Sequence, residues 1–413
     1  MTTAQGISAF GDAFASVAMP LLVLQISGQV ALMGLTVSLS VIGRLVTGVV
    51  AGGVVDRFDR RQLVVVTEAA DFVLAGSIPV AWLLLPEDQW LAVAMIQILV
   101  VVTLSSVVST IHDVALRTLM PTLAGRDRLL VVNARVTTVT EITYGVGPAV
   151  AGVVVALAGA QLAIGVNAVT FAISAGLFCM LRLPHAGRAV AVTAKGGNRG
   201  VGLRYVWSHP FLRPLLVMEL VNTLLVAGVV TLFIYYLRVG IGEGPISVGL
   251  VLSLASVGAL AASLCVAPAR KRFGYGRVWL GGVALEGAAL CFVALHQSLT
   301  ALAVLAVVFA MGNVTCAIVG STVRQLATPD PILGRVTAAT MTVLLSAEAV
   351  GVLGVTISAQ LLPVVAIFVA VGAACICWAA VGLFTAVGRT DPSQDANLGV
   401  FPRTPEGVTG GSL

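Results

Sequence analysis

Eight ionisable side chains lie inside long apolar stretches of this 413-residue chain: Asp12, Arg44, Glu68, Asp71, Glu141, Glu219, Glu286 and Glu348. Such groups are costly in apolar surroundings and persist mostly at substrate pathways and proton relays. A carboxyl group in a low-dielectric cavity favours its neutral form, so it can exchange a proton for a cationic or polar ligand. The residues therefore predict binding and release of a proton or a ligand. The alternative is that each makes only a polar contact between helices.

The sequence offers little for enzyme chemistry. It contains no Gly-x-x-x-x-Gly-Lys-Ser/Thr loop that could hold the phosphates of ATP. Its four histidines are isolated and lack metal-ligand spacing. Its six cysteines all fall in apolar runs, which favours their interpretation as small buried hydrophobic residues. We therefore expect no enzyme, no metal or other cofactor, and no nucleic-acid partner.

The composition indicates that lipid surrounds most of the chain. Hydrophobic residues make up 58% of the sequence and charged residues 10%, whereas soluble domains carry about 25% charged residues. A membrane-spanning helix needs roughly 20 apolar residues. The predicted fold is an all-α integral membrane protein with twelve such helices, at 5–26, 33–55, 62–85, 90–114, 132–158, 161–182, 213–237, 246–268, 277–296, 298–322, 336–360 and 364–387.

The basic residues predict how the helices cross the membrane. Of the 23 Lys and Arg residues, all but Arg44, Arg135 and Arg238 fall in alternate loops, the linker between the halves or the C-terminal tail. Basic residues mark the cytosolic side of membrane proteins. We therefore expect a multi-pass protein of the cell inner (cytoplasmic) membrane, with both termini in the cytosol.

A repeat divides the chain into two halves. Arg57-Phe58 recurs as Arg272-Phe273, and the basic turns fall at equivalent places in each half. Parallel repeats of this kind indicate two bundles related by an axis along the membrane normal. We expect a six-helix bundle at 1–182, a cytosolic linker at 183–212 with an interfacial helix over Leu203–Pro214, a second six-helix bundle at 213–388 and a disordered cytosolic tail at 389–413.

One polar turn carries a family resemblance. The stretch Gly52–Arg61 reads Gly-Gly-Val-Val-Asp-Arg-Phe-Asp-Arg-Arg, and five charges in so short a segment must lie outside hydrocarbon. It resembles the loop between helices 2 and 3 of the major facilitator superfamily. The matching residues are Gly52, Asp56, Arg57, Arg60 and Arg61. Asp59 replaces a glycine of the family pattern. The sequence Asp-Arg-Phe-Asp-Arg-Arg resembles that of the branch with enterobactin exporters and macrolide efflux proteins.

The resemblance implies roles for this turn. In the family, the acid equivalent to Asp56 interacts with the facing half, and the arginines bind a carboxylate at the end of helix 4. Asp113 is the matching carboxylate here, and Arg60 is its expected partner. The alternative is that these charges only determine the topology.

Helix 5 resembles an element of exporters in the same superfamily. It contains Gly147, Pro148 and Gly152, which match part of a Gly-Pro-x-x-Gly-Gly pattern. Proline frees a backbone carbonyl and bends a membrane helix, and small residues allow close packing. The resemblance implies export, whereas a general helix-packing face is the alternative.

The fold of the superfamily also ranks the buried charges. Helices 1, 2, 4, 5, 7, 8, 10 and 11 line the cavity of its members, and helices 3, 6, 9 and 12 are peripheral. This ranking favours Asp12, Arg44, Glu141, Glu219 and Glu348 for proton coupling or substrate binding, and leaves Glu68, Asp71 and Glu286 aside. Similar depths in the membrane also make a partial Asp12–Arg44 pair possible.

The resulting hypothesis is a secondary active transporter that exports an amphipathic small molecule, such as a drug, macrolide or siderophore, by proton antiport and alternating access. Its expected partners are the small-molecule substrate, protons and the lipid bilayer, and we expect it to act as a monomer. Two alternatives stay open: an uptake or uniport carrier of the same fold, and a sensor of this fold that does not transport.

Overall fold

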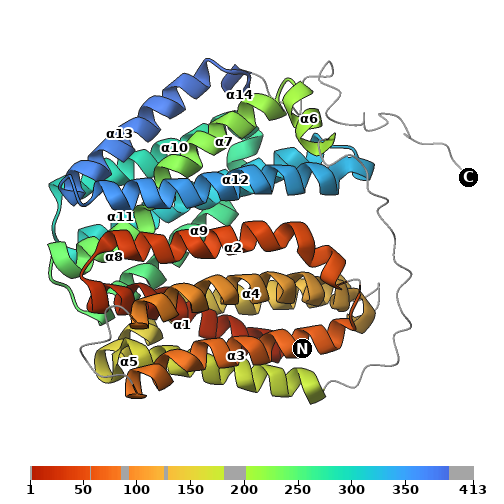
Figure 1. The fold of residues 1–413 in the computed structure, drawn as a ribbon. Coiled ribbons are helices and arrows are strands. Elements are labelled where there is room, and N and C mark those ends of the chain that lie inside the picture. Colours follow the sequence, from red (N-terminus) through yellow and green to blue (C-terminus); the bar gives the residue numbers. More distant parts are fainter. Residues whose placement is uncertain (1, 56, 85–92, 125–128, 181–200, 390–413) are drawn as a thin grey trace, which may run out of the picture.

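The computed structural model describes residues 2–55, 57–84, 93–124, 129–180 and 201–389. Its helices form two groups that lie side by side (Figure 1), one from each half of the chain. Asp56, most of the predicted linker and the tail beyond Arg389 lie outside the described residues.

The first half packs around its longest helix. This half consists of α1 (Thr2–Ser27), α2 (Val30–Val55), α3 (Arg60–Leu84), α4 (Met95–Ala124) and α5 (Leu129–Met180). Helix α5 packs against α1 and α3, and α4 packs against α2 and α3. The faces turned inward are apolar and small, as in α1, where Phe14, Val17 and Leu22 are buried.

The second half begins with the short helix α6 (Val201–Ser208). The remaining elements follow, and among them α11 packs against α9 and α10, while α12 packs against α7. They are α7 (Leu212–Val226), α8 (Val229–Tyr235), the π-helical turn η4 (Tyr236–Gly240), α9 (Pro245–Phe273), α10 (Tyr275–Phe292), the 3₁₀ turn η5 (Val293–Leu295), α11 (Leu299–Leu326), α12 (Asp330–Ser358), α13 (Val364–Leu383) and α14 (Ala386–Arg389).

Within the described ranges, eleven helical segments are long and apolar enough to cross a membrane. One of them, Arg135–Met180, has 46 residues, which is about 69 Å of helix against a hydrocarbon core of about 30 Å. Gly159 interrupts it with φ 86° and ψ 159°, at the boundary predicted between two runs. The segment therefore accommodates two crossings, and the fold accommodates the twelve that were predicted.

Several helices extend beyond their apolar runs. Helix α9 continues to Phe273, and its last turn contains Arg270, Lys271 and Arg272. Helix α11 continues to Leu326 and includes Arg324. Cations stabilise the negative end of a helix dipole. These basic residues therefore allow each helix to continue past the point where its apolar run ends. The predicted loop position of Arg324 was therefore wrong.

The interfacial helix predicted over Leu203–Pro214 is shorter than expected. Helix α6 ends at Ser208, because the side chain of His209 then forms a cap for α7. Its Nδ1 accepts hydrogen bonds from the backbone N–H groups of Phe211 and Leu212, both at 3.2 Å. Burial lowers the pKa of His209 below its ordinary value, so the neutral ring needed for this cap is the favoured form.

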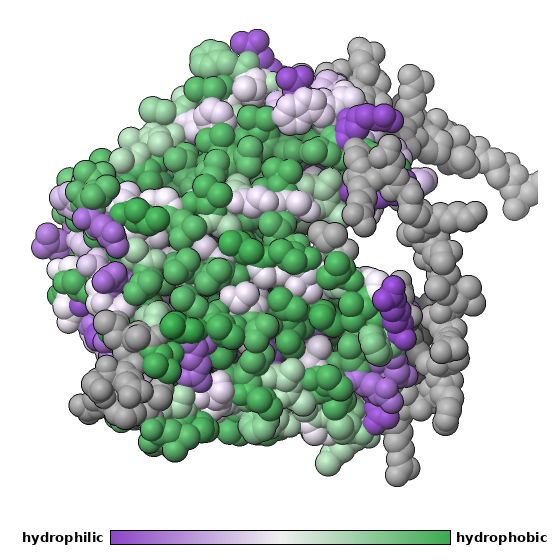
Figure 2. Space-filling view, in the orientation of Figure 1, coloured by the Kyte–Doolittle hydropathy of each residue, from purple (hydrophilic) through white to green (hydrophobic). Residues whose placement is uncertain are grey.

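The outer surface is apolar across the middle of the molecule. In Figure 2, hydrophobic residues cover most of the visible face, and hydrophilic residues gather near the two ends of the helices. Large apolar side chains such as Val46, Val73, Leu157 and Leu264 are exposed in the isolated chain. A soluble protein rarely exposes so much apolar surface, whereas a bilayer covers it.

Candidate functional site

One end of the molecule is closed by contacts between the halves. Helix α2 packs against α12, and α5 packs against α9. Gly152 and Gly249 bring the backbones of α5 and α9 together: a Cβ added at Gly152 would lie 2.6 Å from the Pro245 carbonyl oxygen. Beside them, the Ala149 N–H donates to Ser253 Oγ at 2.8 Å. We call this end the closed end.

A cavity of about 1380 Å³ lies between the halves. Its wall includes Ser8 near the start of α1, Glu68 near the start of α3 and Leu116 near the end of α4. These positions lie toward the end that carries the turn from α2 to α3, and Figure 2 shows the molecule hollowed between the halves there. We call this the open end.

The cavity wall is rich in acids. It contains one arginine, Arg44, and one histidine, His112. Its six acidic residues are Asp12, Glu68, Asp71, Asp113, Glu141 and Glu348. Carboxylates at this density repel one another unless protons or a cation neutralise some of them. The cavity is therefore suited to a cationic ligand or to bound protons.

The two halves contribute unequally to this wall. Five of the six acids come from α1, α3, α4 and α5 of the first half. The second half contributes only Ala227, Val230, Thr231, Ile234 and Glu348. One side of the cavity is therefore acidic, and the facing side is largely apolar, an arrangement that suits an amphipathic molecule.

Four of the five charges favoured from the sequence line the cavity: Asp12, Arg44, Glu141 and Glu348. Arg44 Nη2 lies 3.2 Å from Glu348 Oε1, which joins α2 to α12 across the two halves. Arg44 thus pairs with Glu348. The pairing with Asp12 that their similar depths in the membrane had made possible is not the one observed. Both partners are partly exposed, so the bridge adds about 0–1 kcal/mol to stability.

Glu219, the fifth candidate, does not line the cavity. Its carboxylate forms an ion pair with Arg324 of α11, and both side chains are buried. A role for Glu219 in proton coupling or substrate binding stays a prediction, and its partner Arg324 lies 105 residues away in the sequence. An ion pair sealed inside one half holds α7 against α11 and leaves no open carboxylate for a ligand.

Glu286 is also sealed inside the second half. Its Oε2 accepts from Asn222 Nδ2 and its Oε1 from Asn313 Nδ2, both at 3.0 Å. The residue is fully buried. Asn222 of α7 and Asn313 of α11 thus bind this carboxylate inside the bundle.

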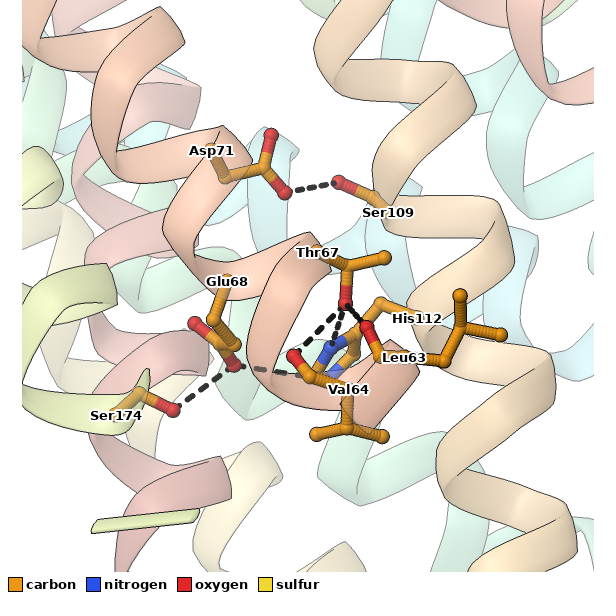
Figure 3. Close-up of polar contacts among 8 residues, drawn as sticks. All are labelled: Leu63, Val64, Thr67, Glu68, Asp71, Ser109, His112 and Ser174. Carbon is orange, nitrogen blue, oxygen red and sulfur yellow. Dashed lines mark hydrogen bonds and ion pairs between the residues drawn. The ribbon is translucent and has the colours of Figure 1, made fainter. Parts of the chain in front are cut away.

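Glu68 and Asp71 do line the cavity, although the ranking by helix set them aside. Figure 3 shows them on α3, facing α4 and α5. Glu68 Oε1 accepts from Ser174 at 2.8 Å and lies 3.6 Å from His112 Nε2. Asp71 accepts from Ser109 at 3.4 Å. Their i, i+3 spacing places both on one helix face, and this was the signal that the ranking overrode.

The turn after α2 is bound to the ends of neighbouring helices. Asp59 Oδ1 accepts from the Gln62 N–H at 2.9 Å and so caps α3. Arg60 donates to the Thr118 carbonyl at 3.3 Å, and Arg61 donates to the carbonyls of Phe178 and Cys179.

The hydrogen bond described for Arg60 has a partner other than the expected Asp113. The bond that Arg60 makes goes to α4 more than one turn beyond Asp113, which itself lines the cavity. The Arg60–Asp113 pair and a gating role for this turn stay predictions. Gly52 lies in the last turns of α2, Arg57 is exposed, and Asp56 lies outside the described residues.

The helix-5 element lies at the contact between helices. A Cβ on Gly147 would collide with Ala13 of α1, and Gly152 contacts α9. The backbone keeps helical dihedrals through Pro148, and the interruption of α5 falls at Gly159. The small residues thus serve close approach, including the contact that closes the cavity.

A metal site finds no support in the described ranges. No group of three or more His, Cys, Asp and Glu residues is positioned there to hold an ion. The acids of the cavity are spread over its wall.

Three comparisons with known proteins bear on this site. The family model described as Major Facilitator Superfamily matches residues 1–244. The chain is 28% identical over 338 residues to the protein called multidrug efflux pump Tap of Mycolicibacterium fortuitum, covering 79% of this chain and 80% of that protein. The protein of that name from Mycobacterium tuberculosis H37Rv is 28% identical over 228 residues, about half of either chain at 53%.

Solved structures share the fold at low identity. A bacterial homologue of the iron transporter ferroportin, in an inward-facing state, superposes with a TM-score of 0.71 at 18% identity, covering 92% of this chain and 97% of that chain. The nucleoside transporter NupG gives a TM-score of 0.69 at 12% identity, with 93% and 98% covered. These likenesses extend over nearly the whole chain.

Proposed function

Because the chain belongs to the Major Facilitator Superfamily and is a membrane transporter, not an enzyme, we propose that it exports an amphipathic cationic small molecule in exchange for protons. The observation that carries this proposal is the cavity wall, with six acids and one arginine. The similarity to proteins named multidrug efflux pumps supports the direction of transport.

The charges of the cavity supply a reason for exchange. Asp12 and Glu141 are exposed to the cavity from α1 and α5, on its acidic side. A cation that binds there stabilises their ionised forms, and protons stabilise their neutral forms. Binding of the cation and binding of protons therefore oppose each other in the cavity, and antiport requires such mutual exclusion.

The apolar side of the cavity supplies the rest of the recognition. Val230 and Ile234 of α8 face the acids across the space. Burial of apolar surface contributes about 25 cal/mol per Å², so an amphipathic molecule gains from both sides. We propose drug-like compounds, macrolides or siderophore-like compounds with a positive charge as the class to test.

The orientation completes the proposal. The open end carries Arg57, Arg60 and Arg61, and the last turn of α9 there adds three more basic residues. Such residues mark the cytosolic side. We propose that the protein lies in the inner (cytoplasmic) membrane, with its termini and the mouth of the cavity in the cytosol, where a substrate for export enters. A single chain forms the whole cavity, which supports a monomer as the transport unit.

Everted membrane vesicles test the proposal with ethidium as the cationic probe. Respiration acidifies the vesicle lumen, and an antiporter that carries the dye inward lets protons leave. We expect ethidium to raise the lumenal pH in vesicles with the wild-type chain. Asp12→Asn and Glu141→Gln should abolish this response, while Glu243→Gln, an acid outside the cavity wall, should retain it.

The other outcomes are equally informative. Dye flux without proton movement would indicate a uniport carrier. Dye binding without flux would indicate a sensor. Either result would overturn the antiport proposal.

A further inference from the structure

The imidazole of His112 and the carboxyl of Glu68 form a pair (Figure 3), and both residues line the cavity. Both side chains are more than nine-tenths buried, with 7% and 2% of their surface exposed. Glu68 belongs to α3 and His112 to α4, and the ring of Phe178 packs edge-on against the imidazole at 6.2 Å. The pair is thus shielded by protein on one side and adjoins the cavity on the other.

The hydrogen bonds around the imidazole indicate where its hydrogen lies. The Thr67 hydroxyl donates its single hydrogen to the carbonyl oxygens of Leu63 and Val64, each of which lies 2.9 Å from Oγ1. Its oxygen therefore accepts from His112 Nδ1, at 3.1 Å. A ring that carries its hydrogen on Nδ1 turns an Nε2 lone pair toward Glu68, unless Nε2 is protonated too.

The contact between the two groups therefore needs a shared proton. Nε2 lies 3.6 Å from Glu68 Oε1. A neutral ring and an ionised carboxylate would place two electron pairs face to face. One added proton removes this repulsion, as an imidazolium beside a carboxylate or as an imidazole beside a carboxylic acid.

Unpartnered atoms indicate that the cluster is incomplete as drawn. Among the described residues, Glu68 Oε2, Asp71 Oδ1 and His112 Nε2 are buried and receive no hydrogen bond. A buried polar atom without a partner is destabilising, and protons on the cluster would reduce that cost. The second half, by contrast, satisfies both oxygens of Glu286.

Apart from two arginines at the start of α3, the charges described near the pair are acidic. Asp12 of α1 and Asp71 of α3 act electrostatically on Glu68, and Asp113 of α4 adjoins His112 in the sequence. From α5, the group that faces Glu68 is the hydroxyl of Ser174, and Glu141 of that helix lines the cavity. The nearby arginines at the start of α3, Arg60 and Arg61, donate to backbone carbonyls. A proton is therefore held firmly until a cation approaches.

On the basis of the proposed function, we propose that the Glu68–His112 pair carries the proton that is exchanged, while Asp12 and Glu141 bind the cationic substrate. A cation bound at Asp12 stabilises the negative charge that the pair acquires when it loses its proton. The proton then leaves Nε2 or the carboxyl group for water in the cavity, and the pair takes up a proton again when the substrate departs. Substrate recognition and proton binding are thus assigned to separate groups, which are coupled through their charges.

Dye binding to the purified protein in detergent tests this division. In weakly buffered solution, a pH indicator reports protons released when ethidium binds, and fluorescence anisotropy gives its affinity. We expect the wild type to release protons and to bind more weakly as the pH falls. Glu68→Gln should lose proton release and pH dependence, with the affinity near neutral pH changed less than about threefold.

Two further variants separate carriage from folding. His112→Gln should shift the midpoint of the pH dependence to lower pH, because an amide donor stabilises ionised Glu68. Asp12→Asn should weaken dye binding itself. Glu243→Gln is the matched control and should match the wild type in release and affinity.

The outcomes distinguish the two proposals. If the wild type binds dye without releasing protons, antiport itself fails. If Glu68→Gln still releases protons while Asp12→Asn or Glu141→Gln does not, antiport stands and the assignment to Glu68–His112 is overturned.

Discussion

The acids of the two halves have different surroundings. In the second half, Glu219 is paired with Arg324 and Glu286 accepts from two asparagines, all inside the bundle. In the first half, Asp12 and Glu141 are exposed to the cavity. A carboxylate with every lone pair directed at a protein donor serves packing, whereas one directed at an open space is available to a ligand. The helix that carries an acid says less about its role than its partners do.

The largest effect expected from this comparison is on the sealed ion pair. Arg324→Met leaves Glu219 as an unpaired buried charge, which costs about 3–5 kcal/mol. The thermal midpoint in detergent should fall steeply. Arg44→Met is the matched control, because it breaks the partly exposed bridge to Glu348 at a cost of about 0–1 kcal/mol. Similar losses in both variants would contradict the distinction between sealed and open acids.

A smaller effect should separate stability from binding. Asp12→Asn should weaken ethidium binding about tenfold, or about 1.4 kcal/mol, with an unchanged thermal midpoint. Glu286→Ala should do the reverse, because Asn222 and Asn313 lose their acceptor, at about 1–3 kcal/mol of stability. Anisotropy titrations and melting curves measure the two quantities. Weakened dye binding in the Glu286 variant with an intact midpoint would argue that the second half also contacts the substrate.

The smallest effect concerns pH and lies outside the membrane spans. Burial lowers the pKa of His209 in the folded state, so the unfolded chain binds a proton first as the pH falls. The stabilising contribution of the neutral cap is present above about 6.5, the unfolded pKa, and is lost as the pH falls from there toward the folded pKa. The thermal midpoint should therefore decline below that pH, and His209→Asn should flatten the decline. An equal slope in both proteins would show that another group titrates.

Much of the fold was predictable because hydropathy and charge act locally. The family resemblance was confirmed by the match over residues 1–244. The break between the fifth and sixth runs falls at Gly159, where a positive φ of 86° suits glycine. The ends of α9 and α11 were missed because their last turns are basic. The length of an apolar run does not measure how strongly such cations stabilise the C-terminal end of a helix.

The site was only partly predictable, for reasons of geometry. Asp12 and Glu141 were favoured from the sequence and do line the cavity. Glu68 was set aside because α3 is peripheral as a helix, yet one face of its half near the open end turns to the cavity. Glu219 was favoured because α7 is central, yet its side chain turns to Arg324. Ranking by helix cannot resolve the direction of a side chain, which depends on rotation about the helix axis.

The glycine contact at the closed end has a mechanical consequence. From Gly249 to Phe273, the last residue of α9, the helix is about 36 Å long. If the halves rotate about the Gly152–Gly249 contact, a rotation of about 10° moves the far end of α9 by roughly 6 Å. A small rotation at this contact between two glycines would therefore widen the other end of the molecule by several times the displacement at the contact itself.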